Sequence, residues 1–325
     1  MIRKLIAAGA LGLLQATLTH AQVYAQRYPD KSIRVIVGFA AGGGTDIASR
    51  VVAGPLSEAL GQTIVVDNRP GAGGTIGNAL GATASADGYT LLMTANGPHV
   101  IAPSLYKSLT YDVFRDYAPI SMVAASPYVL LVHPGVAANS VSELMAWVAR
   151  RSAPARYSSA GQGTPAHLAG ELFRAAAKTD LTHVPYKGAA PALSALLGGE
   201  VELMFCDMPV AAPHLKGGRV RALAVTAASR SALAPDLPTV AEAGVRGYEA
   251  SSWYGLLAPA GTPEAIVKRL NTEMVRVLER KDIRERFASL GSTTASGTPR
   301  EFSETIKRDF ERWAKVIKDA GIKLD

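Results

Sequence analysis

Short, continuous runs of apolar residues recur along the chain and alternate with stretches of helical periodicity. Runs of this length without alternating polar residues are typical of strands that are covered on both faces of a sheet. The spacing of apolar residues between the runs is that of amphipathic helices. This alternation predicts an α/β protein with a mostly parallel sheet. The predicted strands are residues 33–39, 63–68, 89–95, 128–133, 201–205 and 220–227.

The pattern changes after a last apolar run at 254–259. Between Ile266 and Leu278 an apolar residue recurs at every fourth position, and a second amphipathic pattern occupies 298–321. Each pattern opens with a Thr-Pro pair, in which Thr is expected to cap the helix and Pro to take its first position. The carboxyl-terminal part is therefore predicted to form two surface helices with no strand between them.

The first 25 residues have the pattern of a secretory signal peptide. A basic start, MIRK, precedes the apolar stretch LIAAGALGLLQATL, which is too short to span a bilayer comfortably. Small-x-Ala sites follow and end at Ala21 and Ala25. The polar THAQ after the apolar stretch argues against a membrane anchor. We expect export to the periplasm, with cleavage after Ala21 or Ala25.

Composition narrows the possible partners. The formal net charge of +7 suits an anionic ligand, and it also suits solubility alone. Basic residues do not gather in runs interleaved with aromatic residues, so no nucleic acid is expected. The single cysteine, Cys206, lies in an apolar run and is expected to be buried. An exported protein without an internal disulfide must be stabilised by its core, which suits a large periplasmic domain.

Glycine-rich turns recur at the junctions between strands and helices. The stretch FAAGGGTDIASR (39–50) follows a predicted strand and opens a helix. Such a turn presents backbone N–H groups and the positive end of the helix dipole at the carboxyl end of a strand, where α/β sheets bind ligands. These turns favour an anionic ligand. Similar junctions occupy 67–80, 94–100, 157–170 and 186–199.

Other chemistries do not fit these turns. A dinucleotide motif that starts at Gly42 would place Ile47 at its last glycine, and no turn ends in the Gly-Lys-Ser/Thr of a P-loop. The nucleophile motif G-x-S-x-G is absent, since Ser159 lies in SSAG. Cysteine and histidine do not occur with metal-site spacing. Neither a metal nor a cofactor is expected.

Ordered motifs over nearly the whole mature chain resemble the Bug-type (TctC-like) solute receptors of tripartite tricarboxylate transporters. They include YPDKSIRVIVGFAAGGGTDIASR, VVDNRPGAGGTIG, ADGYTLLM, YSSAGQGTPAHLAGELF, HVPYKGAAPAL and SSWYGLLAPAGTP. The resemblance implies a type II periplasmic-binding-protein fold, with two α/β domains joined by crossing strands around a ligand cleft. Domain 1 is expected to take 26–127 plus 250–325, and domain 2 to take 128–249.

The resemblance also implies ligand-binding positions, with one visible departure from the family pattern. Ala195 occupies a helix position where the family often has Asp. Asp46 is expected to tie the first loop to its helix. The implied positions are Phe39, Ala40, Ala41, Gly42, Gly43, Asp46, Thr94, Asn96, Ser159, Gly163, Thr164, His167, Lys187, Gly188 and Asp207.

Several of these positions allow a structural interpretation beside the functional one. Asp46 in the first turn of a helix is favourable for the helix dipole alone. His167 lies inside a helix and is expected to brace a loop rather than to touch the ligand. A lysine such as Lys187 is more often a solvated side chain than a clamp. Asp207 would repel a carboxylate, so either it binds an ammonium group or a bridging water, or it faces away.

The favoured hypothesis is a monomeric, non-enzymatic receptor that passes a small carboxylate to membrane permease subunits. The ligand would be a di- or tricarboxylate, an amino acid or an aromatic acid. One alternative is an exported α/β hydrolase-like enzyme with Ser159, His167 and Asp207 in the cleft, although it lacks a nucleophile elbow. Another alternative is a receptor that presents its closed form to a sensor kinase.

Overall fold

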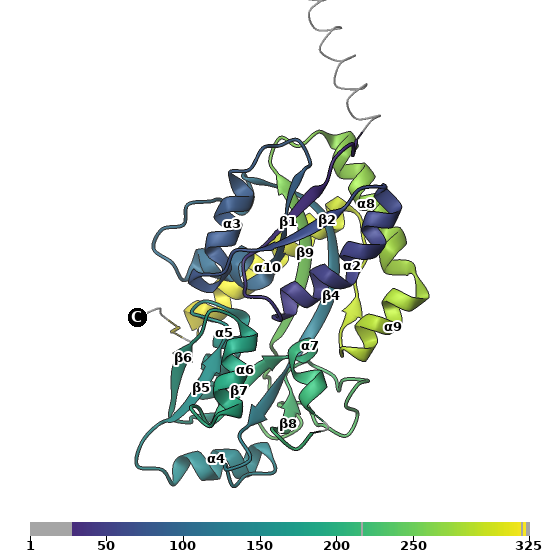
Figure 1. Ribbon diagram of the computed structural model, residues 1–325. Helices are drawn as coiled ribbons and strands as arrows, with labels where there is room; N and C mark the ends of the chain where they lie inside the picture. The colour runs from purple at the N-terminus through teal and green to yellow at the C-terminus, as the bar shows by residue number, and fades with distance from the viewer. Residues whose placement is uncertain (1–27, 216, 320, 323–325) are drawn as a thin grey trace, which may run out of the picture.

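The computed structural model describes residues 28–215, 217–319 and 321–322, and the predicted signal peptide lies outside these residues. The chain forms two α/β lobes, one above the other in Figure 1, connected by long strands. In the described part of the chain, the helices lack the length and apolar character needed to cross a membrane.

The first lobe is built on parallel strands in the order β2-β1-β3. The strands are β1 (Ile33–Val37), β2 (Ile64–Asn68) and β3 (Thr90–Ala95). Parallel pairing places the carboxyl ends of the strands, and the glycine turns that follow them, at one edge. The helical elements are α2 (Gly44–Leu60), α3 (Thr75–Ala82), η1 (Ala72–Gly74), η2 (Gly97–Ile101) and η3 (Ala102–Ser104).

The second lobe repeats this plan with the strand order β6-β5-β7. Cys206 in β7 is fully buried, as predicted. The strands are β5 (Ala155–Ser159), β6 (Leu181–Pro185), β7 (Leu203–Asp207) and β8 (Arg221–Val225). The helical elements are α4 (Val141–Ala149), α5 (Pro165–Ala177), α6 (Ala189–Leu197), α7 (Met208–Ala211) and η4 (Ala212–His214).

Two long strands, β4 (Tyr117–Val132) and β9 (Ser251–Pro259), connect the lobes. They pair antiparallel with each other, and the far end of β4 pairs antiparallel with β7 and β8. The sheet is thus parallel within each lobe and antiparallel at the crossing, whereas the sequence pattern predicted only the parallel part. Thr226 fixes the crossing because its Oγ1 donates to the Ala250 carbonyl at 2.6 Å and accepts the Tyr128 N–H at 2.9 Å.

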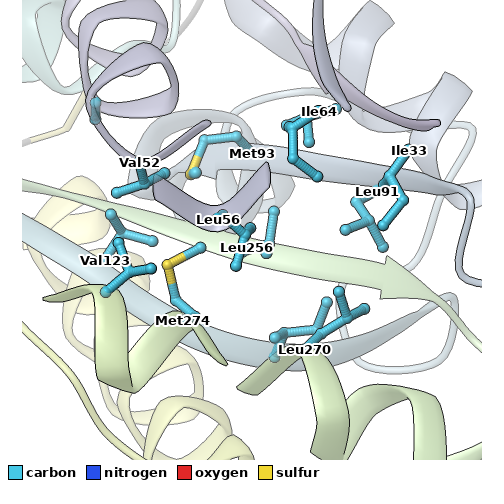
Figure 2. Close-up of a cluster of buried hydrophobic side chains, with 14 of the residues drawn as sticks. Ile33, Val52, Leu56, Ile64, Leu91, Met93, Val123, Leu256, Leu270 and Met274 are labelled. Carbon is cyan, nitrogen blue, oxygen red and sulfur yellow. The ribbon is translucent and has the colours of Figure 1, made fainter. Parts of the chain in front are cut away.

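A continuous apolar core holds the first lobe together. Val52 and Leu56 of α2 pack in one cluster with Leu256 of β9 and with Leu270 and Met274 of α8 (Glu264–Glu279) (Figure 2). Each of these side chains is at most 2% exposed. Full burial of one such side chain contributes roughly 1.5–3 kcal/mol. The apolar stripe of α2 therefore fixes the position of the glycine loop in front of it.

The carboxyl-terminal part differs from the prediction of two helices with no strand between them. The first predicted helix breaks at Arg280, whose backbone is extended (φ −59°, ψ 136°) and whose side chain bonds Glu58 and Asp282. A short strand pairs with β4 before the last helix. Thr298 caps that helix as predicted, whereas α8 begins one residue after its Pro263. The elements are α8 (Glu264–Glu279), α9 (Lys281–Ser289), β10 (Thr293–Thr294) and α10 (Pro299–Asp319).

Candidate ligand-binding cleft

The glycine turns of the two lobes face each other across a cleft and touch. A Cβ placed on Gly188 would lie 3.1 Å from the Cβ of Ala40, and one on Gly73 would lie 2.2 Å from the Gln162 carbonyl oxygen. The Tyr106 hydroxyl donates to the same carbonyl at 3.2 Å. The structure therefore represents a closed arrangement of the lobes.

Phe39 and Ala160 line both of two compartments in this cleft. We call them the outer and the inner compartment. The outer compartment has a volume of about 290 Å³ and is lined by Phe39, 71–74, Tyr106, 160–162 and 185–187. The inner compartment has only about 20 Å³ and is lined by Phe39, 43–45, Ala95, Tyr128, Ala160, 164–166, Ala189, Asp207, Ser252 and Tyr254. The space within it is enough for one water-sized group.

The amino-terminal ends of α2, α5 and α6 converge on the inner compartment. Their contributions to its lining are 43–45, 164–166 and Ala189. The cap residues of α2 and α6, Gly43 and Gly188, provide no side-chain cap. The first-turn N–H groups of both helices therefore need another acceptor, and the helix dipoles add positive potential at the same place. This arrangement suits the carboxylate of a ligand.

Asp46 holds the first ligand loop in shape, as predicted. Its carboxylate accepts the Gly42 N–H at 2.9 Å, Arg50 Nε at 3.0 Å and Asn68 Nδ2 at 3.0 Å. Burial alone would raise the pKa of Asp46, but the hydrogen bond from Arg50, with those from Gly42 and Asn68, outweighs burial and lowers it. Asn68 also donates to the Phe39 carbonyl. Asp46 thus acts on the loop backbone and contributes to neither compartment.

The opposing loop of the second lobe is braced by its own side chains. Ser159 Oγ lies 2.6 Å from His183 Nε2 and accepts the Gly161 N–H. His167 Nδ1 accepts the Gly163 N–H at 3.2 Å, and its ring stacks on His183 with centroids 4.0 Å apart. Burial, with a smaller effect of His167, lowers the pKa of His183 to about 3, so His183 stays neutral. His167 therefore braces this loop, and its contact with a ligand stays a prediction.

The structure does not assemble the hydrolase triad considered for Ser159, His167 and Asp207. The histidine nitrogen bonded to Ser159 Oγ is Nε2 of His183. Asp207 accepts the hydroxyl of Tyr254 in β9 at 3.4 Å. The sequence could not indicate the pairing with His183, because β6 places that histidine beside β5 only in the folded sheet.

Thr94 and Asn96 are buried at the end of β3 and bond to protein groups. Thr94 Oγ1 donates to Asn78 Oδ1 at 2.9 Å. Asn96 donates to the Ser251 carbonyl and accepts the Ser252 hydroxyl, both at 3.0 Å, which ties β3 to the start of β9. Their contact with a ligand stays a prediction.

The remaining predicted residues lie around the cleft in different ways. Phe39, Gly43, Thr164 and Asp207 line the inner compartment, and Lys187 is an exposed residue that lines the outer one. In the part of the chain that the structure describes, Lys187 forms no ion pair. Four predicted residues line neither compartment and lie at contacts between the lobes: Ala40, Gly42, Gly163 and Gly188. Ala41, next to Ala40 in the chain, is exposed.

Sequence reasoning missed several residues of the cleft. The turn at 71–74 lies within one of the glycine junctions, but its sequence pattern does not distinguish a ligand role from a tight turn. Tyr106 lies in a segment without a recognisable pattern. Three further cleft residues, Tyr128, Ser252 and Tyr254, lie on the crossing strands, and they carry no signal that separates a cleft residue from a core residue.

Two α/β lobes with helix amino termini meeting in a cleft at the crossing strands are the architecture of periplasmic solute-binding proteins. Residues 48–322 match the model of the tripartite tricarboxylate transporter family receptor, and the chain belongs to this TctC family. The expected family and the expected two-domain α/β fold are therefore confirmed. Members of the family are receptors and not enzymes, so the hydrolase alternative is not supported.

The similarity to known proteins extends over nearly the whole chain. Protein BugT of Bordetella pertussis is 39% identical over 305 residues, which are 94% of each chain. The structure of Rpa4515 from R. palustris with adipate has a TM-score of 0.89 and 36% identity, and covers 91% of this chain and 99% of that one. MatC from Rhodopseudomonas palustris with bound malate has a TM-score of 0.85 and 33% identity, and the match covers 89% of this chain and 100% of that one.

Proposed function

We propose that this protein captures a small carboxylate in the periplasm and delivers it to the permease of a tripartite transporter. The observation that carries the proposal is the convergence of α2 and α6, both without side-chain caps, on a cleft between two lobes. The Asp46 network holds the loop before α2 in place, and N–H groups fixed in this way bind a carboxylate without reorganisation. The adipate and malate in similar structures support this ligand class.

The lobes would act as domains that close on the ligand. In this proposal domain 1 comprises 26–127 plus 250–325, domain 2 comprises 128–249, and the hinge lies in β4 and β9 near Thr226. An open form would admit the ligand, and closure would exclude water from the N–H donors. The ligand contacts would come from Phe39–Gly43, Ser159–Thr164, Lys187 and Gly188, with Thr94 and Asn96 behind them.

Export would follow from removal of the signal peptide after Ala21 or Ala25, and the mature protein would work as a monomer. The closed form would also be suited to recognition by a membrane sensor kinase. Copurification with permease subunits or with a kinase from detergent-solubilised membranes, in the presence and absence of ligand, distinguishes these recipients.

Thermal unfolding of the mature protein with a panel of acids tests the proposed function. The panel contains succinate, malate, adipate, citrate, aspartate, glutamate and nicotinate. A ligand at about 100 times its Kd adds roughly 2.7 kcal/mol to the free energy of unfolding. We expect a clear rise in Tm with at least one acid. Unchanged Tm with all of them, in protein freed of copurified ligand, would contradict the proposal.

A further inference from the structure

The inner compartment combines three helix amino termini with a carboxylate of the protein. Asp207 lies at the end of β7 and is the one charged residue among the described residues that line this compartment. A Cβ placed on Gly44 would lie 2.9 Å from Asp207 Oδ2, so the carboxylate sits directly against the first turn of α2. A ligand carboxylate bound at the same spot would meet a like charge.

The two compartments differ in volume, so each can hold a different part of a ligand. The inner compartment, at about 20 Å³, holds one water-sized group, such as an ammonium or a single carboxylate oxygen. The outer compartment, at about 290 Å³, has room for the rest of a small acid. The exposed residue Lys187 and the glycine turn 71–74 also line it. The cleft therefore offers a negative group at its inner end and a positive group at its outer end.

We infer that Asp207 forms a subsite for a ligand ammonium group, and that this receptor prefers an amino-bearing dicarboxylate to the matching plain diacid. The inference rests on the proposed function. The ammonium would lie between Asp207 and the Tyr254 hydroxyl, and the neighbouring carboxylate would face the N–H groups of α2. The second carboxylate would extend into the outer compartment toward Lys187.

The surroundings of Asp207 support an ionised carboxylate at neutral pH. Burial raises the pKa of Asp207 to about 6, while hydrogen bonds from Tyr128 and Tyr254 act in the opposite direction. The other ionisable groups packed against it are these two tyrosines and the Cys206 thiol, and burial raises the pKa of each, so all three stay neutral. An ionised carboxylate at this place needs a cationic partner.

Calorimetric titration with matched acids tests the inference. The pairs are aspartate with succinate, glutamate with glutarate, and 2-aminoadipate with adipate. For the wild type at pH 7.5 we expect the amino acid of at least one pair to bind tenfold or more tightly than its diacid. In Asp207→Asn the ratio of the affinity for the amino acid to the affinity for its diacid should fall at least tenfold. The diacid should bind as tightly as before or more tightly.

Two controls separate the subsite from general effects. Asp236→Asn removes an exposed carboxylate from the same lobe and should leave both affinities unchanged. Tyr254→Phe removes the hydroxyl that faces the ammonium but keeps the charge of Asp207, so the preference for the amino acid should weaken less than in Asp207→Asn. Thermal unfolding of each variant shows whether it is folded.

The pH dependence provides a second readout. Wild-type affinity for the amino acid should rise between pH 5 and pH 7 as Asp207 ionises, and that of Asp207→Asn should not. A diacid that binds as tightly as its amino partner, or a ratio that Asp207→Asn leaves unchanged, overturns the ammonium subsite while leaving the receptor function intact. Binding of no acid by the wild type would instead overturn the proposed function.

Discussion

Asp46 and Asp207 lie on opposite lobes and have opposite electrostatic environments. Asp46 is 2% exposed, yet its pKa is lowered because Arg50, Gly42 and Asn68 donate to it. The pKa of Asp207 is raised to about 6 because burial outweighs two tyrosine donors. The first carboxylate therefore stabilises the folded chain when ionised, and the second one destabilises it.

Asp46→Asn is expected to destabilise the protein at neutral pH by roughly 1–3 kcal/mol, because hydrogen bonds to a charged acceptor are lost. The folded-state pKa of Asp46 is lowered from 3.8, so its contribution is present above that value and is lost as the pH falls below it. Urea unfolding at pH 7 and pH 3 measures both effects. A difference between variant and wild type that does not shrink at pH 3 would contradict this account.

Asp207→Asn is expected to have the opposite effect. Its folded-state pKa of about 6 lies above the ordinary value of 3.8, so ionisation costs stability as the pH rises through this range. The variant should be more stable than the wild type at pH 8 by up to about 3 kcal/mol, since one pKa unit corresponds to about 1.4 kcal/mol. The two proteins should be equally stable at pH 3.5. Destabilisation at both pH values in urea unfolding would show that Asp207 is mainly a structural acceptor.

At the scale of elements, the start of α2 decides how closely the lobes approach. Gly44 is the first residue of this helix, and a Cβ there would lie 2.9 Å from Asp207 Oδ2 of the second lobe. Gly54 lies in the same helix, and a Cβ added to it would have nothing within 4 Å. The two glycines form a matched pair for testing closure.

Gly44→Ala is expected to weaken ligand binding at least tenfold, because the added methyl group keeps Tyr254 and Asp207 away from α2. The free energy of unfolding should fall as well, because the methyl group would lie 2.3 Å from the hydroxyl of Tyr254, which is buried in the same lobe. Gly54→Ala should bind normally and be more stable by up to about 1 kcal/mol. Calorimetric titration and urea unfolding of both variants provide the comparison. Equal affinities in the two variants would mean that binding does not need the contact at Gly44.

Elements with an unbroken pattern could be predicted from the sequence, and elements defined by tertiary contacts could not. The apolar runs predicted β1, β3 and β7, and the glycine junctions predicted where α2 and α5 begin. The first part of β4 was missed because Pro119 and Ser121 interrupt its apolar run, and bulges fit it to β9. The break at Arg280 has no glycine or proline to signal it.

The candidate site was predictable to a similar degree. The loops at 39–43 and 159–164 could be placed because they have more glycines and small residues at a strand end than a tight turn alone needs. The networks behind them could not be read from sequence, since Asn68 and His183 reach these loops only through parallel strand pairing. Tyr106 reaches the cleft from a segment without strands, where no periodicity constrains the chain.

At the scale of the whole molecule, the lobes touch through Gly73, Gly188 and Tyr106. We expect the ligand-free protein in solution to open about β4 and β9, because closure without a ligand leaves the helix N–H groups unsatisfied. Small-angle scattering should show a smaller radius of gyration when a bound acid is added to the wild type or to Gly54→Ala. The same radius with and without acid in the wild type would contradict closure on the ligand.

The most direct measurement is a crystal structure of the mature protein with the acid that raises Tm most. The account predicts closed lobes and a ligand carboxylate oxygen within hydrogen-bond distance of backbone N–H groups at the start of α2 or α6. An acid bound outside the cleft, or one held in the cleft without these N–H groups, would contradict the central claim.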